Sequence, residues 1–326
     1  MLGGRHAVTV EGRAGGLTEI DAPGLRPDNL LAFLALLGFL RAAACSSPET
    51  LVAASWPGPS RQCRLHCPTG TERARLVELV DAGLRQLGPV QLFEGKMDLS
   101  LTPREFRLEA RSAAGNADRT LMLSALGSDG ALRRSGKDEH IQPTPLCLMF
   151  GQGHQHFLQR LEDTFARADS VSETEARRDL ERAVFEVWDY EDETESFRWD
   201  PMEDRRYALQ YGDPSKGKNK VGTMSGANRL AAAGFALFTT APRSRGLQMV
   251  AQAGSGSDTL ICWPLPAVPT TLDGYRALLS HPALIDDSRA PELASYRVGA
   301  VARAKRAHVG KFLSIGIARI QALGTE

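Results

Sequence analysis

The stretch from Asn29 to Arg41 is apolar on nearly every side of the helix that its spacing predicts. The apolar positions are Leu30, Leu31, Phe33, Leu34, Leu36, Leu37, Phe39 and Leu40. Such a helix has no face for water, so we expect it to lie buried at the centre of the N-terminal core. Asp28 precedes the helix and is predicted to cap its first turn. The run is too short to cross a bilayer, which needs about 20 residues.

Short strand and helix patterns surround this segment without the regular alternation of a doubly wound sheet. Strands are predicted at 17–20, 51–56, 62–67, within 90–101, and at 246–251, 259–263 and 296–305. Helices are predicted at 71–87, 104–112 and 117–126, from Phe157, from Ser172, from Ser225, and at 272–279. We therefore expect an α+β fold with mixed or antiparallel sheets, a buried N-terminal helix and no doubly wound parallel sheet.

The polar residues 128–142, which include two glycines, predict a flexible loop or linker. They divide the chain into an N-terminal α+β domain at 1–127 and a C-terminal α+β domain at 143–326. The latter would carry a basic loop and a basic strand. The length of 326 residues is enough for two such domains.

The net charge of the chain is zero, so any affinity for nucleic acid must come from local segregation of charge. Residues 186–204 carry nine carboxylates and one arginine, whereas residues 295–311 carry five basic residues and no acid. Solvated faces are the alternative reading of both runs. Five cysteines, an odd number, favour free thiols in a reducing compartment. With no signal peptide in the first residues, we predict a cytoplasmic protein without a membrane partner.

The segment from Phe197 to Phe238 combines a Trp-Asp-Pro motif, a lysine-rich loop and a helix of small residues. Lys216, Lys218 and Lys220 lie among glycines and an asparagine, which is typical of backbone that meets phosphate. Residues 212–219 come close to the phosphate-binding loop of nucleotide hydrolases. The magnesium-binding hydroxyl is replaced by Asn219, so contact with backbone phosphates without chemistry is favoured over nucleotide hydrolysis.

The stretch 303–311 alternates basic and small residues in a predicted strand. Arg303 and Lys305 would project to one side and Arg306 to the other. Such a row can line a groove that follows the sugar-phosphate backbone. An edge strand protected from aggregation by its charges is the alternative. The predicted nucleic-acid-binding residues are Lys216, Lys218, Lys220, Arg229, Arg303, Lys305, Arg306 and Lys311.

No metal site, cofactor or catalytic residue is predicted. Cys63 and Cys67 flank His66, but a structural zinc needs four ligands and no second pair lies nearby, so buried thiols are favoured. His154 and His156 precede the predicted helix at Phe157, where free amides could accept a phosphate or ordinary capping could occur. A nuclease site at these histidines, His140, Asp138 or Glu139 has no support from spacing. The carboxylate run lacks the glycine of a calcium loop, so an acidic surface that contacts a partner is preferred.

Several motifs, taken together, resemble proteins of type I-G (formerly I-U) CRISPR systems. They are Leu25 to Gly38, Gly151 to Leu158, Trp199 to Leu209, Asp213 to Ser215, Gly226 to Phe238, Cys262 to Pro266 and the basic segment Tyr296 to Lys311. The group that these motifs resemble most is the one named as an extension of the helicase-nuclease effector. The sequence is also similar to the large subunits of crRNA-guided surveillance complexes. The motif residues carried by the resemblance are Trp199, Asp200, Arg205, Arg206, Tyr207 and Asn228.

The resemblance implies a role in RNA-guided DNA interference and supplies no catalytic residue. We therefore expect a non-catalytic, nucleic-acid-contacting subunit or accessory factor of a type I CRISPR interference complex. Its expected partners are crRNA or target DNA and other CRISPR-associated subunits. Two alternatives stay open, a metal-dependent nuclease that uses residues around 138–156 and 200–204, and a scaffold that binds only proteins.

Overall fold

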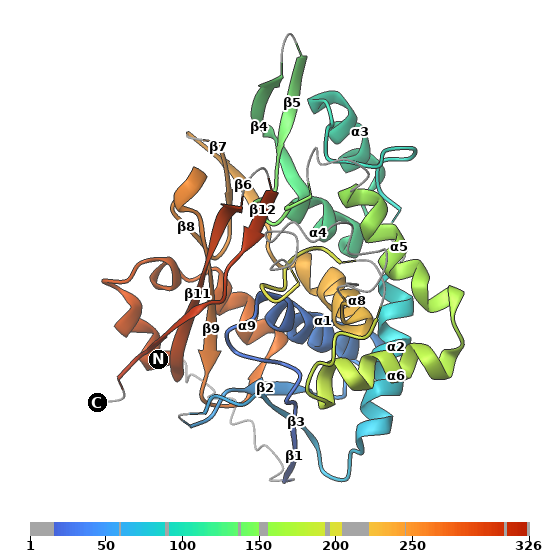
Figure 1. Ribbon diagram of the computed structural model, residues 1–326, viewed down its shortest axis with the longest axis vertical. Helices are drawn as coiled ribbons and strands as arrows, with labels where there is room; N and C mark the ends of the chain where they lie inside the picture. The colour runs from blue at the N-terminus through green and yellow to red at the C-terminus, as the bar shows by residue number, and fades with distance from the viewer. Residues whose placement is uncertain are drawn as a thin grey trace, which may run out of the picture.

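The computed structural model describes residues 16–58, 60–88, 91–135, 138–149, 156–192, 196–203, 222–244, 246–309 and 312–324. Over these ranges the chain is a mixture of helices and four antiparallel sheets, with no parallel sheet (Figure 1). The predicted α+β class is confirmed. In the same ranges, no helix is both long enough and apolar enough to cross a membrane.

Two helices pack at the centre of the molecule, α1 (Leu30–Ser46) and α8 (Ser225–Phe235). Every residue of α1 from Leu30 to Ala43 is buried, as the all-round apolar pattern predicted. The two helices meet at glycines. A Cβ on Gly38 would lie 1.8 Å from the Leu230 carbonyl oxygen, and one on Gly234 would lie 2.0 Å from the Leu34 carbonyl oxygen. Only residues without a side chain permit so close a crossing.

The predicted cap of α1 was wrong by one residue. Asn29 is the N-cap, and its Oδ1 accepts a hydrogen bond from the Ala32 amide at 3.3 Å. Asp28 instead pairs with Arg26, Oδ2 to Nη2, at 2.8 Å. Asn29 is buried, whereas Asp28 is partly exposed. The N-cap is therefore the neutral side chain, which has hydrogen-bond partners inside the protein.

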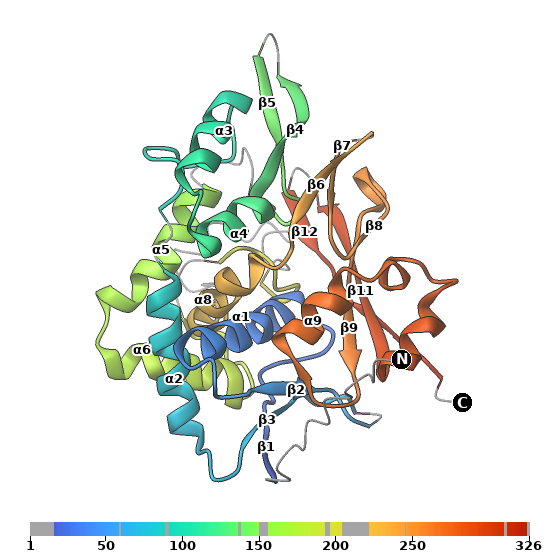
Figure 2. The same cartoon turned by 180° about the vertical axis from the view of Figure 1, so that it is seen from behind.

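The other helices surround this pair. α2, α5 and α6 lie along one side of it, and α9 lies on the other (Figures 1 and 2). The bounds are α2 (Arg73–Leu87), α3 (Pro103–Ser112), α4 (Ala117–Leu126), α5 (Phe157–Ser170), α6 (Glu173–Phe185) and α9 (Leu272–Leu279). These agree with the predicted helices, and Ser172 caps α6 by accepting from the Glu175 amide.

The first sheet has the order β1-β3-β2-β10 and the second has the order β12-β11-β9-β8, with β13 also paired to β11. The strands of the first are β1 (Leu17–Asp21), β2 (Ala53–Ser55), β3 (Arg64–Pro68) and β10 (Thr270–Thr271). Those of the second are β8 (Gln252–Ala253), β9 (Leu260–Pro266), β11 (Val298–Val309), β12 (Phe312–Ile315) and β13 (Arg319–Ala322). Because β10 pairs with β2, the parts before and after residues 128–142 are in contact. The division into two domains stays a prediction.

Two local predictions were wrong. Of residues 128–142, expected as a loop or linker, 128–135 and 138–142 lie in a hairpin of β4 (Gly127–Ser135) and β5 (Asp138–Pro143). Beside it lies a second hairpin, β6 (Thr240–Arg243) with β7 (Gly246–Met249). Conversely, the described residues 91–101 contain no strand. The hairpin forms because Leu101 accepts the amide of Ile141 and β4 packs against α3 and β6, contacts that local sequence cannot reveal.

Candidate nucleic-acid interface

The basic strand β11 is a central strand rather than an edge. It pairs with β9 from Val298 to Lys305, and on its other side with β13 and then β12. The edge-strand alternative is therefore wrong, because both backbone edges are occupied over most of the strand. The charges of β11 do not serve to block a free edge.

Arg303 is held inside the structure. Its side chain is 10% exposed, and its Nη2 lies 2.8 Å from Asp287 Oδ1. Its Nη1 donates a hydrogen bond to Gln321 Oε1 at 2.7 Å. These contacts join β11 to β13 and to the turn before η3 (Ala290–Tyr296), so the structure gives Arg303 an internal role.

Lys305 and Arg306 differ from Arg303. The Lys305 side chain is 59% exposed, and its Nζ is 3.7 Å from Asp258 Oδ1, which makes a weak surface pair. Arg306 is half-buried, its Nε is buried, and no described residue accepts a hydrogen bond from that atom. Burial lowers the pKa of Arg306, and the nearby Cys147 offsets part of the shift. These two cations are the part of β11 that a ligand could use.

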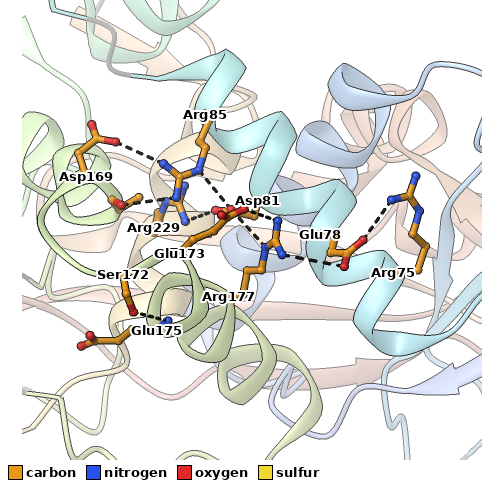
Figure 3. A network of polar contacts seen from close by, with 11 residues as sticks. Arg75, Glu78, Asp81, Arg85, Asp169, Ser172, Glu173, Glu175, Arg177 and Arg229 are labelled. Carbon is orange, nitrogen blue, oxygen red and sulfur yellow. Dashed lines mark hydrogen bonds and ion pairs between the residues drawn. The ribbon is translucent and has the colours of Figure 1, made fainter.

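Arg229 lies in an internal network of charges on α2, α6 and α8 (Figure 3). The centre of the network is Asp81, which is buried on α2. Its Oδ1 accepts from Arg229 Nη1 at 2.8 Å, and its Oδ2 accepts from Arg85 Nε at 3.2 Å. Arg177 Nε approaches the same Oδ2 at 3.8 Å. Since Arg229 is itself buried, this geometry uses its charge within the protein, and we leave it out of the interface proposed below.

The outer members of this network complete it. Arg85 Nη1 lies 3.4 Å from Asp169 Oδ1, and Arg177 also pairs with Glu173 and Glu78. Burial lowers the pKa of Arg229, while the hydrogen bond and charge of Asp81 raise it. The network thus compensates a buried guanidinium and joins the three helices.

Trp199 of the Trp-Asp-Pro motif is part of the core. Its ring stacks on Phe197 at a centroid distance of 4.3 Å and on Phe235 at 5.7 Å. The indole Nε1 donates to the Leu146 carbonyl at 2.8 Å. Both the ring and its polar atom are therefore satisfied inside the protein. The motif tryptophan fixes α8 against the loop before α5.

Asp200 connects the same motif to the start of α1. Its Oδ1 accepts from Asn29 Nδ2 at 3.0 Å and from the Met202 amide at 2.8 Å. Asn29 is the cap of α1, so Asp200 orients the capping side chain. Asp200 is fully buried, and this burial raises its pKa although both donors lower it.

Asn228 lies in a second buried cluster beside the first. Its Nδ2 donates to Thr223 Oγ1 at 2.9 Å, and its Oδ1 accepts from the Phe197 amide at 3.3 Å. The Thr223 hydroxyl in turn donates to the Glu203 carboxylate. Glu203 and Thr223 stand on either side of the segment 204–221 in sequence. The cluster therefore holds together the two described ends that flank the predicted lysine loop.

The remaining predicted residues lie outside the described part of the chain. They are Arg205, Arg206, Tyr207, Lys216, Lys218, Lys220 and Lys311. Of the predicted binding residues that are described, Lys305 and Arg306 follow one another on β11 and project to opposite faces of the sheet. The structure places Arg229 and Arg303 in separate internal contacts.

The N-terminus of α5 does not offer amides to a phosphate. Asp98 Oδ1 accepts from the Phe157 amide at 3.0 Å, and Asp98 Oδ2 lies 2.7 Å from His156 Nδ1. The amides of Leu158 and Gln159 donate to the Met97 carbonyl at 2.9 and 3.2 Å. The suggested phosphate site at this helix end was wrong, because residues 97–98 cap it from a distant loop. His154 lies outside the described residues.

The described histidines, cysteines and carboxylates form no group of three or more that could hold a metal ion. Cys63 and Cys67 are buried free thiols, as predicted, and burial raises the pKa of both. His66 is buried between them in sequence, and its Nε2 shares a hydrogen bond of 2.8 Å with Ser55 Oγ. These contacts are those of a β-sheet core.

A polar pocket of about 460 Å³ opens between α2, α3 and the start of α4. Its wall includes Glu94, Glu109, Asp118 and Arg119. Glu109 is bonded to Arg119 and Asp118 to Arg41, so ion pairs balance most of the charge of this wall. None of the predicted nucleic-acid-binding residues lines this pocket, and we leave it out of the interface.

No protein-family model matches the chain, and no curated protein is a significant match. Sequence reasoning missed Asp81, Asn29 and Asp98, which determine how the charges and helix ends are satisfied. Asn29 stood next to the predicted cap and could have been found from its side chain alone. Asp81 and Asp98 carried no local signal, because their partners are distant in sequence.

Proposed function

We propose that this protein is a non-catalytic, nucleic-acid-contacting subunit or accessory factor of a type I CRISPR interference complex, acting in antiviral defence. In such complexes base pairing reads the sequence, while protein contacts shape and backbone. The observation that carries the proposal is the exposed Lys305 on β11, whose Nζ makes only a weak surface pair with Asp258. Arg306 follows it on the strand and projects to the other face of the sheet.

The lysine loop is the second element of the proposed interface. Lys216, Lys218 and Lys220 belong to a segment whose flanking residues, Glu203 and Thr223, are hydrogen-bonded. The motif residues Trp199, Asp200 and Asn228 support these flanking residues rather than touching the ligand.

The partners follow from the same proposal. Backbone contact suits either crRNA or target DNA, and the resemblance to type I-G proteins adds other CRISPR-associated subunits and a cytoplasmic location. The nuclease alternative receives no support from the described residues, because no three of their histidines, cysteines and carboxylates form a group that could hold a metal ion, and His156 is bonded to Asp98. Mg²⁺ and Mn²⁺ are nevertheless included in the test.

The test is a binding titration of the full chain with labelled single- and double-stranded RNA and DNA at several salt concentrations, with and without Mg²⁺ or Mn²⁺. We expect salt-sensitive binding without cleavage. The variant Lys216→Ala/Lys218→Ala/Lys220→Ala should weaken binding to all sequences and reduce the dependence of log K on log salt by up to about three, one per phosphate contact.

The matched control is Arg75→Ala/Arg104→Ala/Arg276→Ala, which removes three exposed cations from three other helices. It changes the net charge equally and should leave most of the salt dependence intact. Equal losses in both triple variants would mean that only net charge matters. Absence of binding at low salt would refute the proposal in favour of a protein scaffold, and metal-dependent cleavage would refute it in favour of a nuclease.

A further inference from the structure

Lys305 and Arg319 lie on the same face of the second sheet. Arg319 of β13 is the register partner of Arg303 on β11, and partners in an antiparallel pair project to the same face. Lys305 follows Arg303 by two residues, and β11 is regular over this stretch, so Lys305 shares that face and is the diagonal neighbour of Arg319. Diagonal neighbours are about 7–8 Å apart, a distance that two long side chains can span.

The cations of this face differ in whether a carboxylate is close to them. Arg303 is paired with Asp287 at 2.8 Å, and its side chain is only 10% exposed. Arg319 is exposed, and no described residue forms an ion pair or hydrogen bond with its side chain. Lys305 has only the long contact of 3.7 Å with Asp258, in which both side chains are exposed. Lys305 and Arg319 are therefore two solvated cations that an anion can reach.

An exposed apolar side chain lies beside the two cations. Ile317 is 46% exposed and belongs to the short break between β12 and β13. The Gly316 amide donates to the Lys305 carbonyl at 3.0 Å, which places this break next to Lys305. Ala318 is buried, whereas its neighbours Ile317 and Arg319 are exposed, so both of them project outward. The surface thus combines two cations with one apolar side chain.

This combination favours a single strand of nucleic acid over a duplex. In a duplex the bases are stacked on one another, so a side chain meets only sugar, phosphate and base edges. In a single strand the bases can turn outward and lie against side chains, while cations follow the backbone. An exposed apolar residue beside two cations therefore fits a strand whose bases are open.

We propose that Lys305 and Arg319 contact neighbouring phosphates of one strand and that Ile317 packs against the base between them, so that this face binds single-stranded RNA or DNA. The inference rests on the proposed function and names the form of nucleic acid that this face takes. Arg319 has no basic neighbour in the sequence and approaches Lys305 only through the pairing of β13 with β11.

The first experiment compares Arg319→Ala with Arg243→Ala in the full chain. Arg243 is also an exposed arginine on a strand, β6 of another sheet, so both variants change the net charge equally. Binding of labelled single- and double-stranded RNA and DNA is measured across salt. Arg319→Ala should weaken single-strand binding about fivefold and lower the slope of log K against log salt by about one, and Arg243→Ala should do neither. Arg319→Lys should restore the slope, since it keeps the charge.

The second experiment removes the apolar contact. Ile317→Asn should weaken single-strand binding about fivefold at an unchanged salt slope, because an apolar contact releases no counterions. Its duplex binding should equal that of the parent protein. Leu51→Asn, which replaces another exposed apolar side chain, is the control and should alter neither. The melting temperatures of these variants should match that of the parent protein, since all the substituted side chains are exposed.

The outcomes separate this inference from the proposed function. If the parent protein binds nucleic acid but prefers a duplex, or if Arg319→Ala or Ile317→Asn binds single strands as well as the parent protein, the inference fails while the proposed function stands. If the parent protein binds no nucleic acid at low salt, the proposed function fails and the inference fails with it. Loss of single-strand binding in Arg319→Ala and Ile317→Asn alone supports the inference, and the RNA and DNA arms identify the strand.

Discussion

The charge network around Asp81 and the basic strand β11 differ in whether each of their arginines has a carboxylate partner. In the network, Asp81 is a single buried carboxylate that meets Arg229, Arg85 and Arg177 from three helices. On β11, Arg303 is paired with Asp287, whereas Arg306, three residues further along the strand, has no described carboxylate partner. Arg229 is buried, whereas Arg306 is only partly buried. A buried arginine that has a carboxylate partner stabilises the fold, and an arginine that reaches the surface can contact a ligand.

The largest expected effect is that of Asp81→Asn. The amide keeps the shape of the side chain but leaves Arg229 buried without a counter-charge. We expect the free energy of unfolding to fall by about 3–5 kcal/mol, the range for breaking a buried pair by removing one partner. Urea unfolding at neutral pH measures it. Glu78→Gln, at the exposed rim of the same network, is the control and should change stability by less than about 1 kcal/mol. Equal losses of stability in the two variants would mean that the buried carboxylate of Asp81 contributes no more than an exposed one.

Removing both members of the pair should be milder. The double variant Asp81→Leu/Arg229→Met replaces the ion pair with apolar side chains, and we expect it to be more stable than Asp81→Asn by at least about 1 kcal/mol. Arg85 and Arg177 keep other carboxylates, namely Asp169, Glu173 and Glu78. The free energies of unfolding of Asp81→Leu, Arg229→Met and the double variant, each compared with the parent protein, give the coupling energy. A coupling near zero would contradict the network.

Asp200 offers an acidic counterpart to Arg306, since it is buried and burial raises its pKa above the usual 3.8. A raised folded-state pKa contributes stability below the unfolded pKa, and this contribution is lost as pH rises through the folded value. Asp200→Asn cannot ionise and keeps an oxygen for Asn29 and Met202. Its stability relative to the parent protein should therefore rise between pH 4 and pH 7. Melting temperatures at these two pH values test this, and a constant difference would argue against a raised pKa.

Lys305→Ala should have the smallest effect on the fold. The side chain is 59% exposed and its pair with Asp258 is long, so we expect stability to change by less than about 0.5 kcal/mol. Binding should nevertheless lose about one unit of salt slope if Lys305 contacts a phosphate. Arg276→Ala, an exposed cation on α9, is the control. An unchanged slope in Lys305→Ala would remove this lysine from the interface.

Elements with a strong local pattern were predicted well. The helices α2, α4 and α6 and the strands β2, β3, β9 and β11 lie where apolar spacing and turn residues place them. The β4–β5 hairpin was missed because glycines and charges dominate it, and Ile141 is buried only through contact with other elements. For the interface, the sequence identified Lys305 and Arg306 by charge alone. It could not separate them from Arg229 and Arg303, since the partners of those residues lie elsewhere in the chain.

By itself, the sequence determined that residues 30–43 had to be buried, because a helix that is apolar all round has no stable place in water. It also determined the clustering of basic residues on one strand, since composition and alternation are local properties. Only the tertiary structure decided that α8 is the partner of α1, through the facing glycines Gly38 and Gly234. It likewise decided which arginines are neutralised, because Asp81 and Arg229 are 148 residues apart and meet only when three helices pack. The sequence shows which residues are charged, but whether a charge is neutralised depends on which residues lie close to it in space.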